Sequence, residues 1–165
     1  MNIKKNNLFF NLIFIVFTTL LLNGCGSDPV QDDLINYINN QIPKIIPLEA
    51  EIMDEYSSVT GENYKDDPTM LKALQTLRPK CRKMLTILED EITPKTAEVR
   101  KIHELYIDAY NNYYNAFLLI ELAIEKADPG TIVKANEKLD KARRLQRDWL
   151  SDLNELKRKH NVVTE

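Results

Sequence analysis

The sequence predicts an all-α fold: an antiparallel up-down-up-down four-helix bundle with proline-kinked first and second helices. Two patterns predict it. Apolar residues recur at steps of three and four, and a helix-capping residue is followed by proline at four places. The chain also has only four glycines, so turn and linker signals are sparse. The cap–proline pairs are Asp28-Pro29, Asp67-Pro68, Thr93-Pro94 and Asp128-Pro129.

Each cap–proline pair is expected to start a helix. Asp and Thr accept hydrogen bonds from the free amides of a first turn, and proline there loses no hydrogen bond. Short connections near 61–67, 92–94 and 128–130 make consecutive helices antiparallel neighbours. Internal prolines should kink the first two helices, because each removes a backbone hydrogen bond and crowds the preceding turn. These prolines are Pro43, Pro47 and Pro79.

Each expected helix carries one apolar stripe, which predicts one buried face per helix. In the first helix the stripe is Leu34, Ile38, Ile42, Ile45, Ile52, Tyr56 and Val59. In the third it is Val99, Ile102, Tyr106, Tyr110, Tyr113, Phe117, Ile120 and Ile124.

Charge is distributed unevenly along the chain. Residues 25–67 hold ten acids and two bases, whereas residues 129–165 hold nine bases and six acids. The first and last helices are therefore expected to meet with opposite charge. Without residues 1–24 the chain would hold 20 bases and 25 acids, a net charge of −5 that argues against nucleic acid as a partner, since that would call for a basic surface.

The start of the chain has the three zones of an export signal. Lys4 and Lys5 give it a positive end without any acid, and an apolar run follows over residues 8–22. That run is shorter than the roughly 20 residues that a membrane-spanning helix needs. The run leads into Leu22, Asn23, Gly24 and Cys25.

These last four residues resemble the lipobox of bacterial lipoproteins, which has an aliphatic residue three places before the cysteine and a small residue directly before it. The resemblance covers residues 1–25 and implies cleavage between Gly24 and Cys25, with lipid attached to Cys25. It places the protein at the extracytoplasmic side of the cell membrane, or of the outer membrane in a Gram-negative host. Asn23 departs from the pattern. An uncleaved anchor and an ordinary signal peptide are the alternatives.

The predicted organisation is a signal peptide over 1–24, a lipidated tether over 25–27, a helical domain over 28–161 and a tail over 162–165. Lipid on Cys25 would leave Cys81 as the one free thiol, so stability must come from packing. The tether is so short that the loop 61–67 should lie far from the membrane. Its Tyr64 and Asp66 are candidate contacts for a partner.

One group of residues indicates a pocket midway along the helices. Its members fall at one height when residues are counted back from the turns, and kinked helices around aromatic rings can leave a cavity. The alternative is an ordinary core with a buried, inert thiol. The residues are Pro47, Cys81, His103, Tyr106 and Tyr110.

The sequence predicts no metal site, no cofactor and no enzyme activity. Neither His103 nor His160 follows a glutamate by three residues, the spacing of metal-binding bundles. Motifs for nucleophilic, phosphate-binding or zinc chemistry are also missing. The leading hypothesis is a non-enzymatic module that binds a protein or peptide. A small-ligand carrier or sensor, and an immunity or surface-exclusion lipoprotein, are the alternatives.

Overall fold

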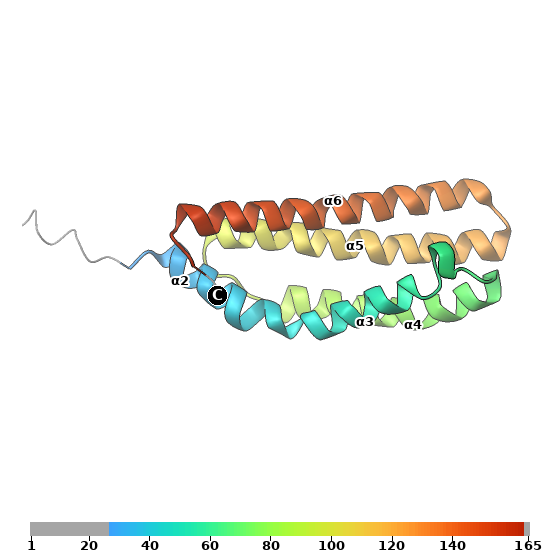
Figure 1. Cartoon of the computed structure of the whole chain (residues 1–165), viewed down its shortest axis with the longest axis horizontal. Coiled ribbons are helices and arrows are strands. Elements are labelled where there is room, and N and C mark those ends of the chain that lie inside the picture. Colours follow the sequence, from blue (N-terminus) through green and yellow to red (C-terminus); the bar gives the residue numbers. More distant parts are fainter. Residues whose placement is uncertain (1–26, 164–165) are drawn as a thin grey trace, which may run out of the picture.

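The two longest helices, α5 (Ala97–Lys126) and α6 (Pro129–Lys159), lie side by side along most of their length (Figure 1). They belong to a computed structural model that describes residues 27–163. All regular secondary structure in that range is helical. The predicted signal peptide, with Gly24 and Cys25, lies outside the described residues.

The first helical segment changes geometry twice along its length. Its parts are α2 (Pro29–Asn36), a π turn η1 (Tyr37–Gln41), a 3-10 turn η2 (Ile42–Lys44) and α3 (Ile46–Ser57). Pro43 lies in the 3-10 turn and Pro47 in the first turn of α3. Proline cannot donate the backbone hydrogen bond of a helix interior, which accounts for the break at this point.

The second helix, α4 (Asp67–Thr86), continues through Pro79 and ends in a π turn, η4 (Ile87–Glu91). A single 3-10 turn, η3 (Gly61–Asn63), connects α3 to α4. Gly61 has a φ of +59°, a left-handed conformation that glycine adopts without a side-chain clash.

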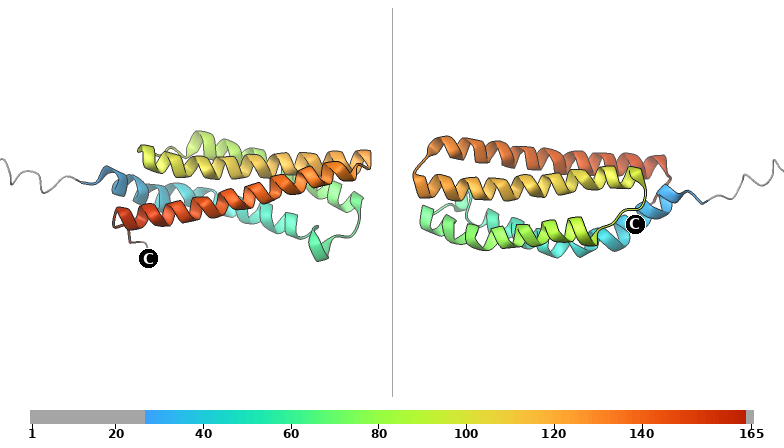
Figure 2. Two further views of the ribbon diagram at one scale, coloured as in Figure 1. Left: turned by 90° about the horizontal axis from the view of Figure 1, so that it is seen from above. Right: turned by 180° about the vertical axis from the view of Figure 1, so that it is seen from behind.

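Consecutive helices pack against one another: α3 on α4, α4 on α5, and α5 on α6, while α2 also contacts α5. The right-hand view of Figure 2 shows the α5–α6 pair on one side and α3 with α4 on the other. Their apolar faces form one continuous core. The stripe predicted for the third helix is buried from Val99 to Ile120, and Ile124 packs at its edge.

Three of the four predicted helix starts are found, one of them displaced by a residue. Asp28 and Asp128 accept hydrogen bonds from backbone amides of the first turns of α2 and α6. For α4 the capping residue is Asp66, which accepts from the Thr69 amide at 2.8 Å, and Asp67 is already helical.

The predicted start at Thr93-Pro94 is wrong. The chain after η4 is extended, and Thr96, the residue before α5, makes no capping bond with its own side chain. Asp33 of α2 instead binds the two residues that precede α5. Its Oδ2 accepts from the Lys95 amide at 2.9 Å, the Thr96 amide at 2.7 Å and the Thr96 hydroxyl at 2.8 Å. A contact from so distant a residue leaves no local sequence signal.

The buried stripe of the first segment departs from the predicted one at η1. Tyr37 is completely buried and Gln41 nearly so, whereas Ile38 and Ile42, which the spacing predicted to be buried, are only partly covered. A π turn holds more residues per turn than an α-helix, so it shifts which positions face inward. Tyr37 therefore takes a central core position that the simple repeat assigned to its neighbour.

The expected pairing of acidic first helix with basic last helix is largely absent. Among residues 27–163, the lysine and arginine ion pairs between helices join α3 to α4 and α4 to α5. Lys80 pairs with Glu51 at 2.6 Å and Glu55 at 2.7 Å, and Arg78 pairs with Glu121 at 2.5 Å. Two acids of α3, Glu51 and Glu55, thus share one lysine of the adjacent helix.

Replacing Asp33 with alanine should destabilise the protein. The variant loses the acceptor for three donors at the start of α5, which costs stability. It also removes the Oδ1 atom, which is buried without a partner, and this offsets part of the cost. We expect the free energy of unfolding in urea to fall by about 1–2 kcal/mol. The matched control is Asp32→Ala, which removes an exposed acid from the same helix and should cost less than about 1 kcal/mol. Equal losses in the two variants would contradict the role assigned to Asp33.

Candidate binding site

Four of the five residues predicted to line a central pocket lie in the core. Cys81, His103, Tyr106 and Tyr110 are each at most 4% exposed, and the rings of Tyr106 and Tyr110 are 5.6 Å apart. Pro47 is exposed and does not join them. Neither of the two surface clefts described below is lined by any of these residues.

His103 is the centre of a buried hydrogen-bonded chain. Its Nε2 lies 2.8 Å from the Leu88 carbonyl, which can only accept, so this nitrogen carries the hydrogen. Its Nδ1 therefore accepts from the Tyr37 hydroxyl at 3.2 Å, and the Tyr37 oxygen accepts from the Trp149 indole at 3.1 Å. Burial lowers the pKa of His103, consistent with a neutral ring. The chain joins η1, η4, α5 and α6 through side chains.

A second polar group lies between α3 and α6. The Gln146 amide donates to Glu49 at 3.0 Å, and the Tyr113 hydroxyl donates to the Gln146 carbonyl oxygen at 2.8 Å. The Tyr110 hydroxyl is buried without a hydrogen-bond partner. Burial, together with the charge of Glu49, raises the pKa of both Tyr106 and Tyr110. These phenols therefore stay neutral, and most of their polar neighbours are already engaged with one another.

Cys81 lacks the environment of a reactive thiol. It is fully buried, and burial raises its pKa to about 12. A thiolate, the nucleophilic form, is therefore rare at neutral pH.

The two residues predicted to contact a partner at the distal loop have local roles. The Tyr64 hydroxyl donates to Asp67 at 2.7 Å, and Asp66 caps α4. The Tyr64 ring is still 48% exposed. The loop thus keeps an accessible aromatic ring, while the Asp66 carboxylate is used within the fold.

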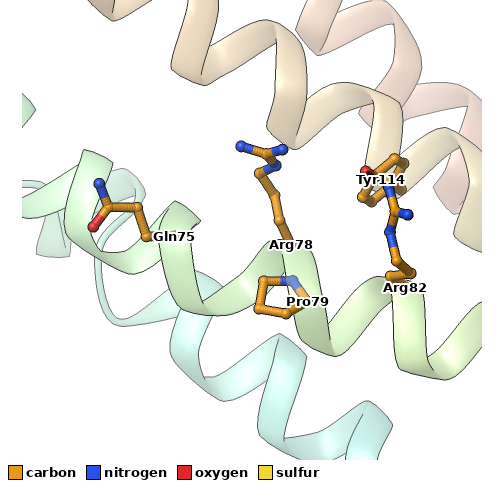
Figure 3. Close-up of a pocket in the computed structure, with 5 residues that line it drawn as sticks. All are labelled: Gln75, Arg78, Pro79, Arg82 and Tyr114. Carbon is orange, nitrogen blue, oxygen red and sulfur yellow. Dashed lines mark hydrogen bonds between the residues drawn. The ribbon is translucent and has the colours of Figure 1, made fainter.

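A surface cleft of about 340 Å³ lies between α4 and α5 (Figure 3). We call it the arginine–tyrosine cleft. Its lining combines two guanidinium groups, a phenol, an amide and a proline ring: Arg78, Arg82, Tyr114, Gln75 and Pro79. Arg78 and Arg82 are four residues apart and so share one face of α4, where both extend toward α5.

The charges in the cleft are only partly balanced. Arg78 is paired with Glu121, whereas Arg82 donates at 2.7 Å to the Tyr114 hydroxyl, a neutral acceptor. The Arg82 guanidinium also lies 5.5 Å from the centre of the Tyr114 ring, within the range of a cation–π contact. The hydrogen bond from Arg82, together with the nearby charge of Arg78, lowers the pKa of Tyr114. The cleft is therefore a place of positive potential.

A second cleft, of about 490 Å³, lies at the end of α6. Its lining is basic, polar and apolar: Asn154, Lys157, Arg158, Asn161, Val162 and Val163. Val163 is 92% exposed, whereas Val162 is buried. This cleft is beside the start of α2, because Gln31 contacts the backbone of Asn161.

Among the described residues, no group of His, Cys, Asp and Glu side chains is arranged to hold a metal ion. Within residues 27–163, no helix has the length and apolar character required to cross a membrane.

Comparisons with protein-family models, curated proteins and solved structures give no match for this chain. Function must therefore be inferred from its residues and their geometry.

The buried His103 should make stability depend on pH. Its pKa is lowered from the ordinary 6.5 by burial, so the unfolded chain binds a proton at a pH where the folded protein does not. Stability is then complete above the unfolded pKa and declines as the pH falls toward the folded pKa. Urea unfolding between about pH 7.5 and about pH 6 should show this decline. A His103→Gln variant, which still contains His160, should show a weaker one. The same decline in both proteins would contradict the prediction.

Cys81 should resist alkylation in the folded protein. Iodoacetamide needs a thiolate and access, and Cys81 offers neither. Peptide mapping by mass spectrometry should find Cys81 unmodified under native conditions and fully modified in concentrated urea. Rapid native modification at Cys81 would show that the core opens readily or that the thiol is activated.

Proposed function

We propose that this protein is a bacterial lipoprotein, held at the outer face of a membrane by lipid on Cys25, and that it is a non-enzymatic module that binds a protein or peptide. The motif formed by Leu22, Gly24 and Cys25 supports the anchor. The structural observation that carries the proposal is a set of contacts that fastens the start of α2 to the end of α6.

Those contacts are short and specific. Asp28 Oδ2 lies 2.6 Å from His160 Nδ1, and the Gln31 amide donates to the His160 carbonyl at 2.9 Å. We call this pair of contacts the terminal clasp. Figure 1 places the described C-terminal end beside α2. Because Asp28 is three residues after Cys25, an extended tether would span only about 10 Å. Lipid on Cys25 would therefore hold both chain ends close to the bilayer.

We propose further that the helical segments form one antiparallel four-helix bundle, bent in its first two helices by proline. The segments would be 29–57, 67–91, 97–126 and 129–159. The contacts of α3 with α4, α4 with α5 and α5 with α6 support the up-down-up-down order. The change of helix type around Pro43 supports a bend in the first segment. In this arrangement the helices stand on the membrane and expose their sides.

A binding role follows from what the sides would present. The arginine–tyrosine cleft lies between α4 and α5, with Tyr114 midway along α5, whereas the terminal clasp joins the start of α2 to the end of α6, so the membrane would not cover the cleft. Arg82 within it is exposed and charged. An exposed arginine beside an aromatic ring is a combination that is common in protein interfaces.

The alternative of a small-ligand carrier has one supporting observation. The Tyr110 hydroxyl is fully buried without a partner beside the Glu49 group, and such an atom can mark a place for a water or a ligand. Its polar neighbours are nevertheless bonded to each other, so we favour the binding module.

The anchor is tested by the mass of the mature N-terminus. In a bacterial host, mass spectrometry should find a chain that begins at Cys25 and carries acyl groups, and membrane fractions should contain it. A Cys25→Ala variant should remain uncleaved or be released from the membrane. The control is Cys81→Ala, which removes the other cysteine and should leave processing unchanged. An unmodified Cys25 in a normally processed protein would refute the lipoprotein assignment. Loss of processing in the Cys81 variant would show that folding, not lipid transfer, is being measured.

A further inference from the structure

The arginine–tyrosine cleft has an unbalanced positive charge. Its two arginines face one carboxylate, that of Glu121, which pairs with Arg78. Among residues 27–163 Arg82 forms no ion pair, and its hydrogen-bond acceptor is a neutral phenol. The local excess is therefore one positive charge, held on an exposed side chain whose direction is fixed by the Tyr114 ring.

The cleft is prepared for an oxygen anion. The contact with Tyr114 orders the Arg82 side chain before any ligand arrives, which reduces the entropy lost on binding. The same positive field that favours the ionised phenol of Tyr114 favours any negative group placed beside it. Pro79 and the Tyr114 ring add an apolar surface, and Gln75 adds an amide that can bond to a peptide backbone.

We propose that the arginine–tyrosine cleft binds one carboxylate of an acidic protein segment, with Arg82 as the principal contact. An excess of one positive charge matches a single carboxylate better than a phosphate dianion. The Arg78–Glu121 pair shows that the wall of this cleft already accommodates a carboxylate against a guanidinium. Planar guanidinium and carboxylate groups also match geometrically. This inference rests on the proposed binding function and names the chemistry of the partner, but it does not require lipid on Cys25.

The test uses the full chain in neutral detergent micelles and two short blocked peptides, Ala-Glu-Glu-Ala and Ala-Gln-Gln-Ala. Nuclear magnetic resonance would follow the arginine side-chain N–H signals and the tyrosine rings during titration. We expect the glutamate peptide to shift the signals of Arg82 and Tyr114 with a Kd on the order of 1 mM. The glutamine peptide should bind at least about tenfold more weakly, since it lacks the charge.

Variants separate a specific contact from general attraction. Arg82→Gln should weaken binding of the glutamate peptide by about tenfold or more. The matched control, Lys83→Gln, removes the same charge from the adjacent exposed position and should change the Kd by less than about twofold. Tyr114→Phe, which keeps the ring but frees Arg82, should weaken binding by less than Arg82→Gln does. Circular dichroism should show equal helix content in all four proteins, because Arg82 and Lys83 are exposed and Tyr114→Phe keeps the ring that packs against the core.

Several results would overturn the inference. Equal binding of the two peptides would show that no carboxylate is recognised, and equal losses in the Arg82 and Lys83 variants would show nonspecific attraction. Tighter binding of inorganic phosphate than of the glutamate peptide would assign a different ligand. If neither peptide shifts the signals of Arg82 or Tyr114, the cleft is not a binding site. Each readout is independent of lipid attachment, so failure of the anchor would appear only in the mass of the N-terminus.

Discussion

The hydrogen-bonded chain through His103 is the constraint on which the packing of this protein depends. The first segment and α6 are connected through bulky side chains, and the buried donors and acceptors among these must be paired, because an unpaired one costs about 1–3 kcal/mol. Both π turns of the fold supply a member of this chain: Tyr37 opens η1, and Leu88 in η4 offers its carbonyl. The π turns η1 and η4 thus serve the same purpose: each places one member of the hydrogen-bonded chain against His103 of α5.

A second set of polar contacts lies around α2. Two aspartates of the α2 region fasten it to distant parts of the protein, Asp33 to the start of α5 and Asp28 to His160 after α6. The helix is only eight residues long and could not be stable by itself. Its polar contacts thus attach the predicted tether to the two longest helices, and any force on a lipid anchor would be transmitted through them.

Most helix positions could be predicted from the sequence, whereas the contacts between helices could not. Apolar spacing and local caps predict helix starts because both are encoded within a few residues, and the stripe ending at Ile120 is buried as expected. The predicted start of α5 was wrong because the segment before it is held by Asp33, which comes from another helix. The cleft was missed because Tyr114 is not part of the apolar stripe: it lies on a different face of α5 from Tyr113. The sequence signal that could have indicated the cleft is the spacing of Arg78 and Arg82, which are four residues apart on one helix.

The division between core and surface bears on what kind of partner the protein can have. Its core polar groups largely satisfy each other, which leaves exposed chemistry, above all that of Arg82, for recognition. The whole chain has a net charge of −3, so its acids outnumber its bases and together repel a long polyanion. A short acidic segment that reaches only the arginine–tyrosine cleft avoids most of that repulsion. A local positive charge on a negative protein therefore favours a short acidic segment over a long polyanion. This kind of specificity does not need a deep pocket.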